Sequence, residues 1–320
     1  MNSVKRIFSF CLLMSLLTVA CGKYNHSPIK NSILCSTTFP LPDGESKEDK
    51  FVHETLSDED DYYMERITFP TTLTTSPRNK SVEMFLYRPH DENINAPVIV
   101  LLPMLGGKGY FSLYMAKKLV NDGYVVLRFT RKKDFLSSGQ GLEFEKKLII
   151  SYVSDVIAGI KHIKKIKELA SRKIGIAGVS MGGIIASLVM SIYKDIDAGV
   201  FVLSGGNWKN IYLLSDDPYI SKYRKKYFHN MSLEIIGNTM DESFKDIDPI
   251  NFVNVIPQDR ILMINALFDR SIPHTSVDDL WNALNKPDRL TIPAGHYSSI
   301  LFLPWISRDI TNFFHKKIIL

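Results

Sequence analysis

The chain has 320 residues, of which 45% are apolar and 23% are charged, with a formal net charge of +5 at pH 7. This composition is typical of a globular protein and excludes a disordered one, and the length suffices to bury a substantial core within a single domain. The small positive excess is not the signature of a nucleic-acid-binding protein. No internal repeat or low-complexity tract is visible.

The first twenty residues have the pattern of a secretory signal peptide. Lys5 and Arg6 precede an uncharged run, residues 7–19, which is shorter than the ~20 residues of a membrane span. The run ends in Leu-Thr-Val-Ala-Cys-Gly, which resembles a bacterial lipobox. That resemblance implies cleavage before Cys21, lipidation of Cys21 and anchoring to a membrane of the bacterial cell envelope. The alternative is ordinary cleavage near Ala20, giving a secreted or periplasmic protein.

Residues 21–60 are predicted to form an N-terminal tether or extension. The stretch 25–50 is rich in Pro, Ser, Lys and Asn, as expected of a tether. If Cys21 carries lipid, Cys35 is the only free thiol left after cleavage, and a disulfide between the two is the alternative. The acidic run 57–61 is interpreted as a solvated loop, and the strand-like segment 62–69 is expected to open a sheet.

Apolar runs rich in Val, Ile and Leu alternate with helical patterns along the rest of the chain. Strands are predicted at 82–89, 96–102, 123–129, 173–177, 260–265 and 289–293. A long helix with a solvated face of lysines is predicted from about Glu143 to Leu169. Continuous apolar strands alternating with helices predict an α/β fold whose central sheet is mostly parallel and flanked by helices.

A serine follows one of these strands in a glycine-rich context. Gly178-Val179-Ser180-Met181-Gly182 comes directly after the strand 173–177 and leads into a helix-like stretch, residues 184–190. Strand, sharp turn and helix are the context that a G-x-S-x-G nucleophile elbow requires. The same residues are also compatible with a glycine-rich turn that ends in a capping serine. Ser180 is therefore a candidate nucleophile that needs partners.

A serine hydroxyl needs an imidazole to take its proton and a carboxylate to orient that imidazole. Asp269 lies just past the strand 260–265, and His296 lies just past the strand 289–293. His274, at the start of a predicted helix, is the alternative base. The order Ser180, Asp269, His296, each after a strand, is the order of the triad in α/β hydrolases.

On these residues the chain resembles the α/β-hydrolase superfamily, most closely its dienelactone-hydrolase-like and prolyl-oligopeptidase-like esterases, from about Val82 to the C-terminus. The resemblance implies a hydrolase domain over residues 61–320. It also implies an oxyanion hole formed by the N–H groups of Met181 and Leu105, in a loop that reads Pro-Met-Leu-Gly-Gly where the family usually has His-Gly-x-x-Gly. Met104 and Gly106 are the alternative second donors. An insertion at about 206–250, rich in aromatic and basic residues, is interpreted as a cap, and packing on the body is the alternative.

The predicted function is hydrolysis of carboxylic esters through an acyl-Ser180 intermediate, with a small-molecule acyl ester as the partner. A serine peptidase or thioesterase on the same fold is the first alternative. A catalytically inactive, surface-anchored binding protein is an alternative of another class. No metal and no organic cofactor are predicted, because the remaining histidines have no cysteine or carboxylate partners at metal-ligand spacing. No nucleic-acid partner is predicted, because the net charge is small.

Overall fold

The computed structural model describes residues 38–41, 50–59, 61–78, 80–90, 96–105, 109–130, 133–136 and 140–319. The predicted signal peptide, the lipidation site Cys21, the thiol of Cys35 and much of the predicted tether lie outside these residues, and so does Gly106. All of the following concerns the unit Thr37–Leu320.

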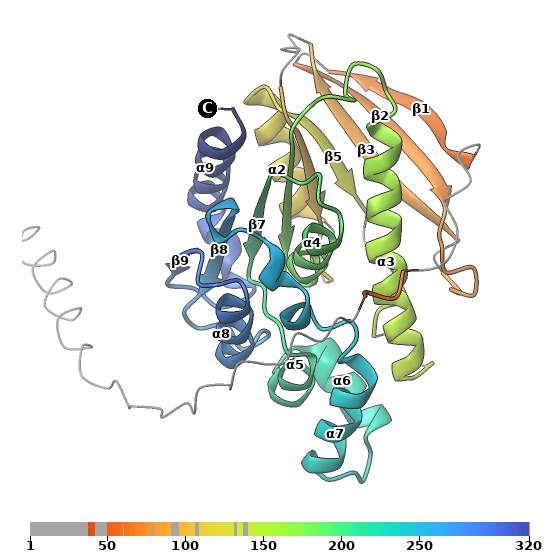
Figure 1. The fold of residues 1–320 in the computed structure, drawn as a ribbon, viewed down its shortest axis with the longest axis vertical. Helices are drawn as coiled ribbons and strands as arrows, with labels where there is room; N and C mark the ends of the chain where they lie inside the picture. The colour runs from red at the N-terminus through yellow and green to blue at the C-terminus, as the bar shows by residue number, and fades with distance from the viewer. Residues whose placement is uncertain are drawn as a thin grey trace, which may run out of the picture. The chain divides into compact units, whose positions relative to one another are not determined.

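A nine-stranded sheet organises this unit, in the order β1-β2-β3-β5-β4-β6-β7-β8-β9 (Figure 1). The pairs β1–β2, β2–β3 and β3–β5 are antiparallel, whereas all pairs from β5–β4 onward to β8–β9 are parallel. The prediction of a mostly parallel sheet in an α/β fold is confirmed. The strands are β1 Val52–Asp58, β2 Tyr62–Pro70, β3 Ser81–Pro89, β4 Val98–Leu102, β5 Val125–Phe129, β6 Ile174–Val179, β7 Ala198–Val202, β8 Ile261–Ala266 and β9 Asp288–Ile292.

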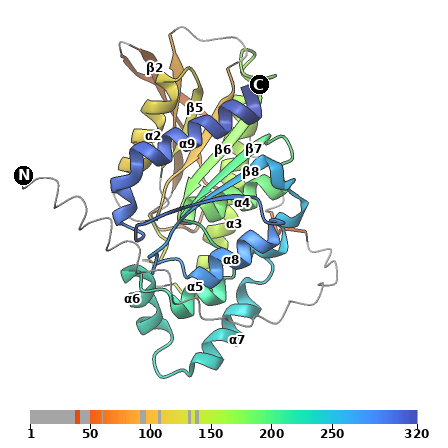
Figure 2. The same cartoon turned by 90° about the vertical axis from the view of Figure 1, so that its left-hand side faces the viewer.

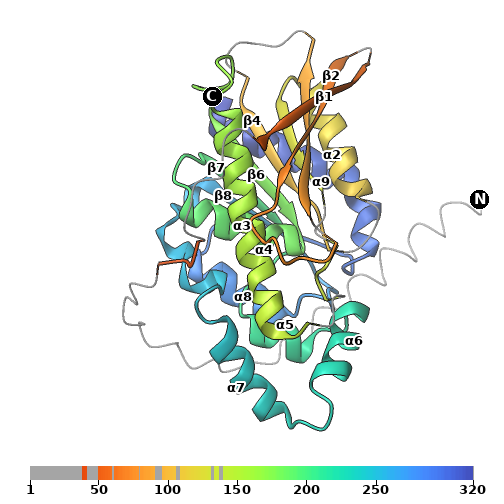
Figure 3. The same ribbon diagram turned by 90° about the vertical axis from the view of Figure 1, so that its right-hand side faces the viewer.

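The central strands are apolar on both faces because helices cover both faces. In β4, Val98 and Val100 pack into one core cluster while Ile99 and Leu101 pack into the other. The helices α3 and α4 cover the first face, and α2 and α9 lie side by side on the second (Figures 2 and 3). The helices are α2 Tyr110–Asn121, α3 Leu142–Ile163, α4 Met181–Ile192, α5 Trp208–Leu214, α6 Pro218–Tyr227, α7 Leu233–Phe244, α8 His274–Ala283 and α9 Leu303–Phe314. Short helical turns are η2 Pro249–Asn251, η3 Val253–Val255, η4 Gln258–Arg260, η5 Ser298–Phe302 and the π-turn η6 His315–Ile319.

The sheet begins one strand earlier than the sequence indicates. β1, Val52–Asp58, pairs antiparallel with β2, so the expectation that the segment 62–69 opens the sheet is wrong. Part of the predicted tether and the first residues of the acidic run therefore belong to this edge strand. Most of the side chains of β1 are exposed, so it carries no alternation of apolar and polar residues that could predict it.

Three helices, α5, α6 and α7, lie between β7 and β8 in the chain. Figure 1 places them beyond the ends of the central strands. Asp217 begins α6 as its N-cap, followed by Pro218 at the first helical position, and Ser232 caps α7. Trp208, Tyr212 and Tyr223 are buried, so these three aromatic residues of the insertion pack inward, whereas Tyr219 is exposed.

Candidate active site

Ser180 lies in the sharp turn between β6 and α4. Its backbone has a φ of 55° and a ψ of −121°, a conformation that residues other than glycine rarely adopt. The turn is held because the Ser180 N–H donates to the Val202 carbonyl at 2.8 Å and the Ser180 carbonyl accepts from the Ile184 N–H at 3.1 Å. Ser180 is thus fixed at the end of a central strand and at the start of a helix.

The two glycines of the motif are required by close backbone packing. A Cβ on Gly178 would lie 2.1 Å from the Gly182 carbonyl oxygen, and a Cβ on Gly182 would lie 2.4 Å from the Leu102 carbonyl oxygen. Neither distance is possible for a side chain, so only glycine allows the strand, the turn and the loop after β4 to approach this closely. The pattern Gly-x-Ser-x-Gly is therefore a geometric requirement of this turn.

Ser180, Asp269 and His296, which the sequence analysis predicts to act together, lie in contact in the structure. Nε2 of His296 lies 3.0 Å from Oγ of Ser180, and Nδ1 of His296 lies 2.8 Å from Oδ2 of Asp269. With the Nδ1 proton donated to the carboxylate, Nε2 is free to accept the proton of the serine hydroxyl. All three side chains are buried.

The carboxylate of Asp269 is itself held in place. Its Oδ1 accepts hydrogen bonds from the N–H groups of Ser271 and Ile272, both at 2.9 Å, which leaves Oδ2 for the imidazole. Asp269 follows β8 and His296 follows β9, and these strands run parallel to each other and to β7. Parallel strands bring their carboxyl ends to one edge of the sheet, which explains how residues far apart in the sequence meet.

His274, the alternative base, does not contact Ser180. Its Nε2 forms a 2.9 Å hydrogen bond with the carbonyl of Leu267, and the residue is exposed at the start of α8. The hypothesis that His274 serves as the base is therefore wrong, because this ring is held by the loop that leads to Asp269.

The predicted oxyanion donors lie around the same serine. Met181 is the first residue of α4, where a backbone N–H has no acceptor within the helix. Met104 and Leu105 line the same pocket as Ser180. Gly106, the other alternative, lies outside the described residues. The assignment of Met181 and Leu105 as oxyanion donors stays a prediction.

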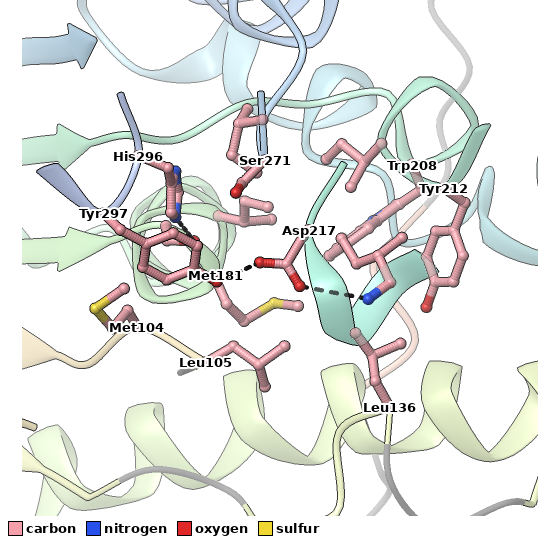
Figure 4. Close-up of a pocket in the computed structure, with 15 residues that line it drawn as sticks. Met104, Leu105, Leu136, Met181, Trp208, Tyr212, Asp217, Ser271, His296 and Tyr297 are labelled. Carbon is pink, nitrogen blue, oxygen red and sulfur yellow. Dashed lines mark hydrogen bonds between the residues drawn. The ribbon is translucent and has the colours of Figure 1, made fainter. Parts of the chain in front are cut away.

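A small, largely apolar cavity of about 40 Å³ adjoins Ser180 (Figure 4). That volume corresponds to about three water molecules at ~10–15 Å³ each. Its walls come from the loop after β4, the start of α4, the insertion between β7 and β8, and the loops that carry Asp269 and His296. The lining residues are Met104, Leu105, Leu136, Ser180, Met181, Ile184, Trp208, Ile211, Tyr212, Asp217, Ile220, Ser271, Ile272, His296 and Tyr297.

Two polar residues of this pocket were not foreseen from the sequence. The hydroxyl of Tyr297, the residue after His296, donates to Oδ2 of Asp217 at 2.5 Å. Burial of the ring, and after it this hydrogen bond to Asp217, raise the pKa of Tyr297 above its usual value. The Asp-Pro pair at 217–218 indicates the start of a helix, but no sequence signal places its carboxylate beside the serine.

A second carboxylate, that of Glu145, holds the backbone of a residue in the pocket wall. Both oxygens of Glu145, in the first turn of α3, accept from the N–H of Leu136, at 3.0 and 3.2 Å. Leu136 has a positive φ of 53° and lines the pocket. Burial raises the pKa of Glu145 to about 7; the Leu136 N–H opposes this increase, and the charge of Asp134 adds to it.

The described residues hold no group of three or more His, Cys, Asp or Glu side chains that could bind a metal ion. Within the same ranges, no helix has the length and the apolar character needed to cross a membrane.

The strand order, the turn at Ser180 and the order of the three buried polar residues define the α/β-hydrolase fold. The family comparison agrees, because residues 82–208 match the model of the dienelactone hydrolase family. This match covers the strands β3 to β7 and the turn that carries Ser180. A comparison with curated proteins found no match.

Several solved structures are similar in fold. The acylaminoacyl peptidase of Pyrococcus horikoshii is 16% identical with a TM-score of 0.60, over 83% of this chain and 44% of the peptidase. The acetyl xylan esterase from Paenibacillus sp. R4 is 15% identical with a TM-score of 0.63, over 83% of this chain and 88% of the esterase. The acetyl xylan esterase from Thermoanaerobacterium sp. is 15% identical with a TM-score of 0.58, over 87% of this chain and 96% of the esterase. The chain spans less than half the length of the peptidase. These similarities show that the chain has the α/β-hydrolase fold.

Proposed function

We propose that the protein is a serine hydrolase that cleaves carboxylic esters through a covalent acyl-Ser180 intermediate. The observation that carries this proposal is the position of His296, which bridges Oγ of Ser180 at 3.0 Å and Oδ2 of Asp269 at 2.8 Å. An imidazole that contacts a hydroxyl on one side and a buried carboxylate on the other can act as a general base without further rearrangement.

The proposed reaction has two stages. Oγ of Ser180 attacks the ester carbonyl while Nε2 of His296 takes the hydroxyl proton; the C–O bond to the alcohol then breaks, and His296 returns the proton to the departing alcohol. Water, deprotonated by the same imidazole, then attacks the acyl carbon. The bond from this carbon to Oγ of Ser180 breaks, His296 returns the proton to Oγ, and the carboxylic acid is released. Asp269 keeps the imidazole in the required tautomer and stabilises its positive charge.

The oxyanion of each tetrahedral intermediate needs hydrogen-bond donors. We assign the N–H groups of Met181 and Leu105 to this task, because both residues line the pocket at Ser180. Each such donor contributes about 3 kcal/mol to transition-state stabilisation in enzymes of this kind. The start of α4 adds the positive end of the helix dipole at the same place.

The size of the cavity favours a substrate with a small acyl group. Its volume of about 40 Å³ leaves room for a few non-hydrogen atoms beside Ser180. The helices α5 and α6 supply Trp208, Tyr212 and Ile220 to its lining, which supports the interpretation of the insertion as a cap. Thioesters and small amides would enter the same first stage, so a thioesterase or peptidase remains the alternative within the enzyme class.

Membrane attachment is a separate proposal. It is supported by the basic residues Lys5 and Arg6, the apolar run that follows them and the position of Cys21. If Cys21 is lipidated, growth of a bacterial expression host with a labelled fatty acid will label the wild-type protein, and Cys21→Ser will abolish that labelling. Equal labelling of both proteins would contradict the proposal.

The hydrolase proposal is tested by the turnover of aryl acetate by wild-type protein and by Ser180→Ala. We expect the variant to lose at least about 10³-fold in kcat while it unfolds at nearly the same temperature as the wild type. Turnover by the wild type that Ser180→Ala does not reduce would contradict a serine mechanism. Absence of turnover across aryl esters, thioesters and anilides would favour the binding-protein alternative.

A further inference from the structure

Asp217 is a buried carboxylate in the wall of the cavity beside Ser180. Only 8% of the residue is exposed. Its Oδ1 accepts from the N–H groups of Tyr219, at 2.9 Å, and Ile220, at 3.4 Å, and its Oδ2 accepts from the hydroxyl of Tyr297. All these donors are electrically neutral, so they solvate the negative charge without cancelling it.

Asp217 is a charged residue in a lining that is otherwise largely apolar. Figure 4 shows it between His296 and Tyr297 on one side and Trp208 and Tyr212 on the other. Among the described residues that line the cavity, Asp217 is the one carboxylate, since Asp269 lies behind His296 and does not border it. In a small cavity with few polar groups, the field of one fixed charge is only weakly screened.

The position of Asp217 is fixed by contacts with the loop that carries Asp269. Oγ of Ser215 donates to the Ser271 carbonyl at 2.7 Å and accepts from the Asp217 N–H at 3.0 Å. The N–H of Asp216 donates to the Arg270 carbonyl at 2.8 Å. Asp217 therefore cannot move out of the cavity unless these two loops separate.

We propose that Asp217 determines which acyl groups the enzyme accepts: it favours short acyl groups that are neutral or carry an ammonium group, and it excludes acyl groups that carry a carboxylate. This inference rests on the proposed ester hydrolysis at Ser180 and names the substrate class of that site. A second carboxylate brought beside Asp217 would lose its hydration and meet a like charge, whereas an ammonium group would meet an anion whose hydrogen-bond donors among the described residues are all neutral. Tyr297 is a positioning residue that holds Oδ2 of Asp217 through its hydroxyl.

Three ethyl esters that differ only in the group at the end of the acyl chain test the proposal, with acid release followed at pH 7 in a pH-stat. Ethyl butanoate is neutral, monoethyl succinate replaces its terminal methyl group by a carboxylate, and ethyl 3-aminopropanoate replaces it by an ammonium group. For the full-length wild-type protein we expect kcat/KM for the succinate to be about 10- to 100-fold below that for the butanoate. We expect the value for the ammonium ester to equal or exceed that for the butanoate. Equal values for the succinate and the butanoate would overturn the proposal, whatever the variants do.

Two variants identify the residue responsible. Asp217→Asn removes the charge but keeps the size and the ability to cap α6, so it is expected to fold and to bring the succinate and butanoate values together. Asp216→Asn is the matched control, because it removes the neighbouring charge, which is exposed and pairs with Arg270 at 3.2 Å. This control is expected to keep the wild-type discrimination. Discrimination that survives in Asp217→Asn, or that disappears in Asp216→Asn, would contradict the assignment.

The failure of this inference can be separated from the failure of the proposed function. Wild-type protein that hydrolyses all three esters at equal rates, and loses this activity in Ser180→Ala, would refute only the selectivity. Wild-type protein that hydrolyses none of them and does not react with a fluorophosphonate would refute ester hydrolysis, and the selectivity with it.

Discussion

The backbone contact at Gly182 allows a sharp test of how the turn at Ser180 depends on the loop after β4. In Gly182→Ala, the new Cβ would lie 2.4 Å from the Leu102 carbonyl oxygen and 2.6 Å from that of Pro103, whereas ordinary contact begins at 3.4 Å. The loop must therefore move by about 1 Å, and this loop leads directly into Met104 and Leu105.

A displacement of this size has different effects on activity and on stability. A shift of about 1 Å in an active site can lower activity ~100-fold, so we expect a loss of at least that order in kcat/KM for an aryl acetate. The overpacking itself should cost about 1–3 kcal/mol of unfolding free energy, measured by urea denaturation.

Gly199→Ala is the matched control for this experiment. Its Cβ would lie 2.7 Å from Sδ of Met190, a flexible side chain, inside β7 and away from the cavity lining. We expect a comparable or smaller loss of stability and nearly unchanged kcat/KM. Wild-type activity in Gly182→Ala, or an equal loss of activity in both variants, would refute the idea that this glycine positions the loop at Ser180.

Three further predictions follow from single contacts. Asp269→Asn should lower kcat about 10⁴-fold with little change in KM, because His296 would lose the acceptor that fixes its tautomer; unchanged kcat would contradict the role of this carboxylate. Burial raises the pKa of Glu145 in the folded protein to about 7 from its ordinary value of 4.5, so the folded form holds this proton more tightly and stability should fall as the pH rises from about 4.5 to 7. Glu145→Gln should remove this loss of unfolding free energy, which is on the order of 3 kcal/mol and is measured by urea unfolding. A variant with the same pH profile as the wild type would contradict the role of Glu145. Burial and the neighbouring His53, whose Nε2 lies 2.8 Å from Nε2 of His162, lower the pKa of His162 to about 4. Stability should therefore fall as the pH drops from about 6.5 to 4, and in His162→Gln the thermal unfolding temperature should depend less on pH over that range.

The parts of the fold that could be predicted from the sequence are those with a local signature. β6 and β8 are continuous apolar runs because they are buried on both faces, and Ser180, Asp269 and His296 could be proposed because each follows such a strand. Parallel pairing then brings the strand ends together, so the order of these residues along the chain predicts their proximity.

The remaining features depend on packing that no local pattern encodes. β1 is an exposed edge strand, so it lacks the apolar alternation that indicates strands. Asp217 and Tyr297 meet because the insertion after β7 folds back over the loop that follows β9. Glu145 lies in an ordinary helix, and only the tertiary structure shows that it supports Leu136 in the cavity wall.

Activation of Ser180 as a nucleophile is tested by intact-mass analysis after exposure to a fluorophosphonate. We expect one adduct on the wild type, none on Ser180→Ala and a strongly slowed reaction of His296→Ala. Ser271→Ala, which removes a second hydroxyl from the same cavity, should still be labelled. A folded wild type that remains unlabelled, or an adduct that persists in Ser180→Ala, would show that Ser180 is not an activated nucleophile.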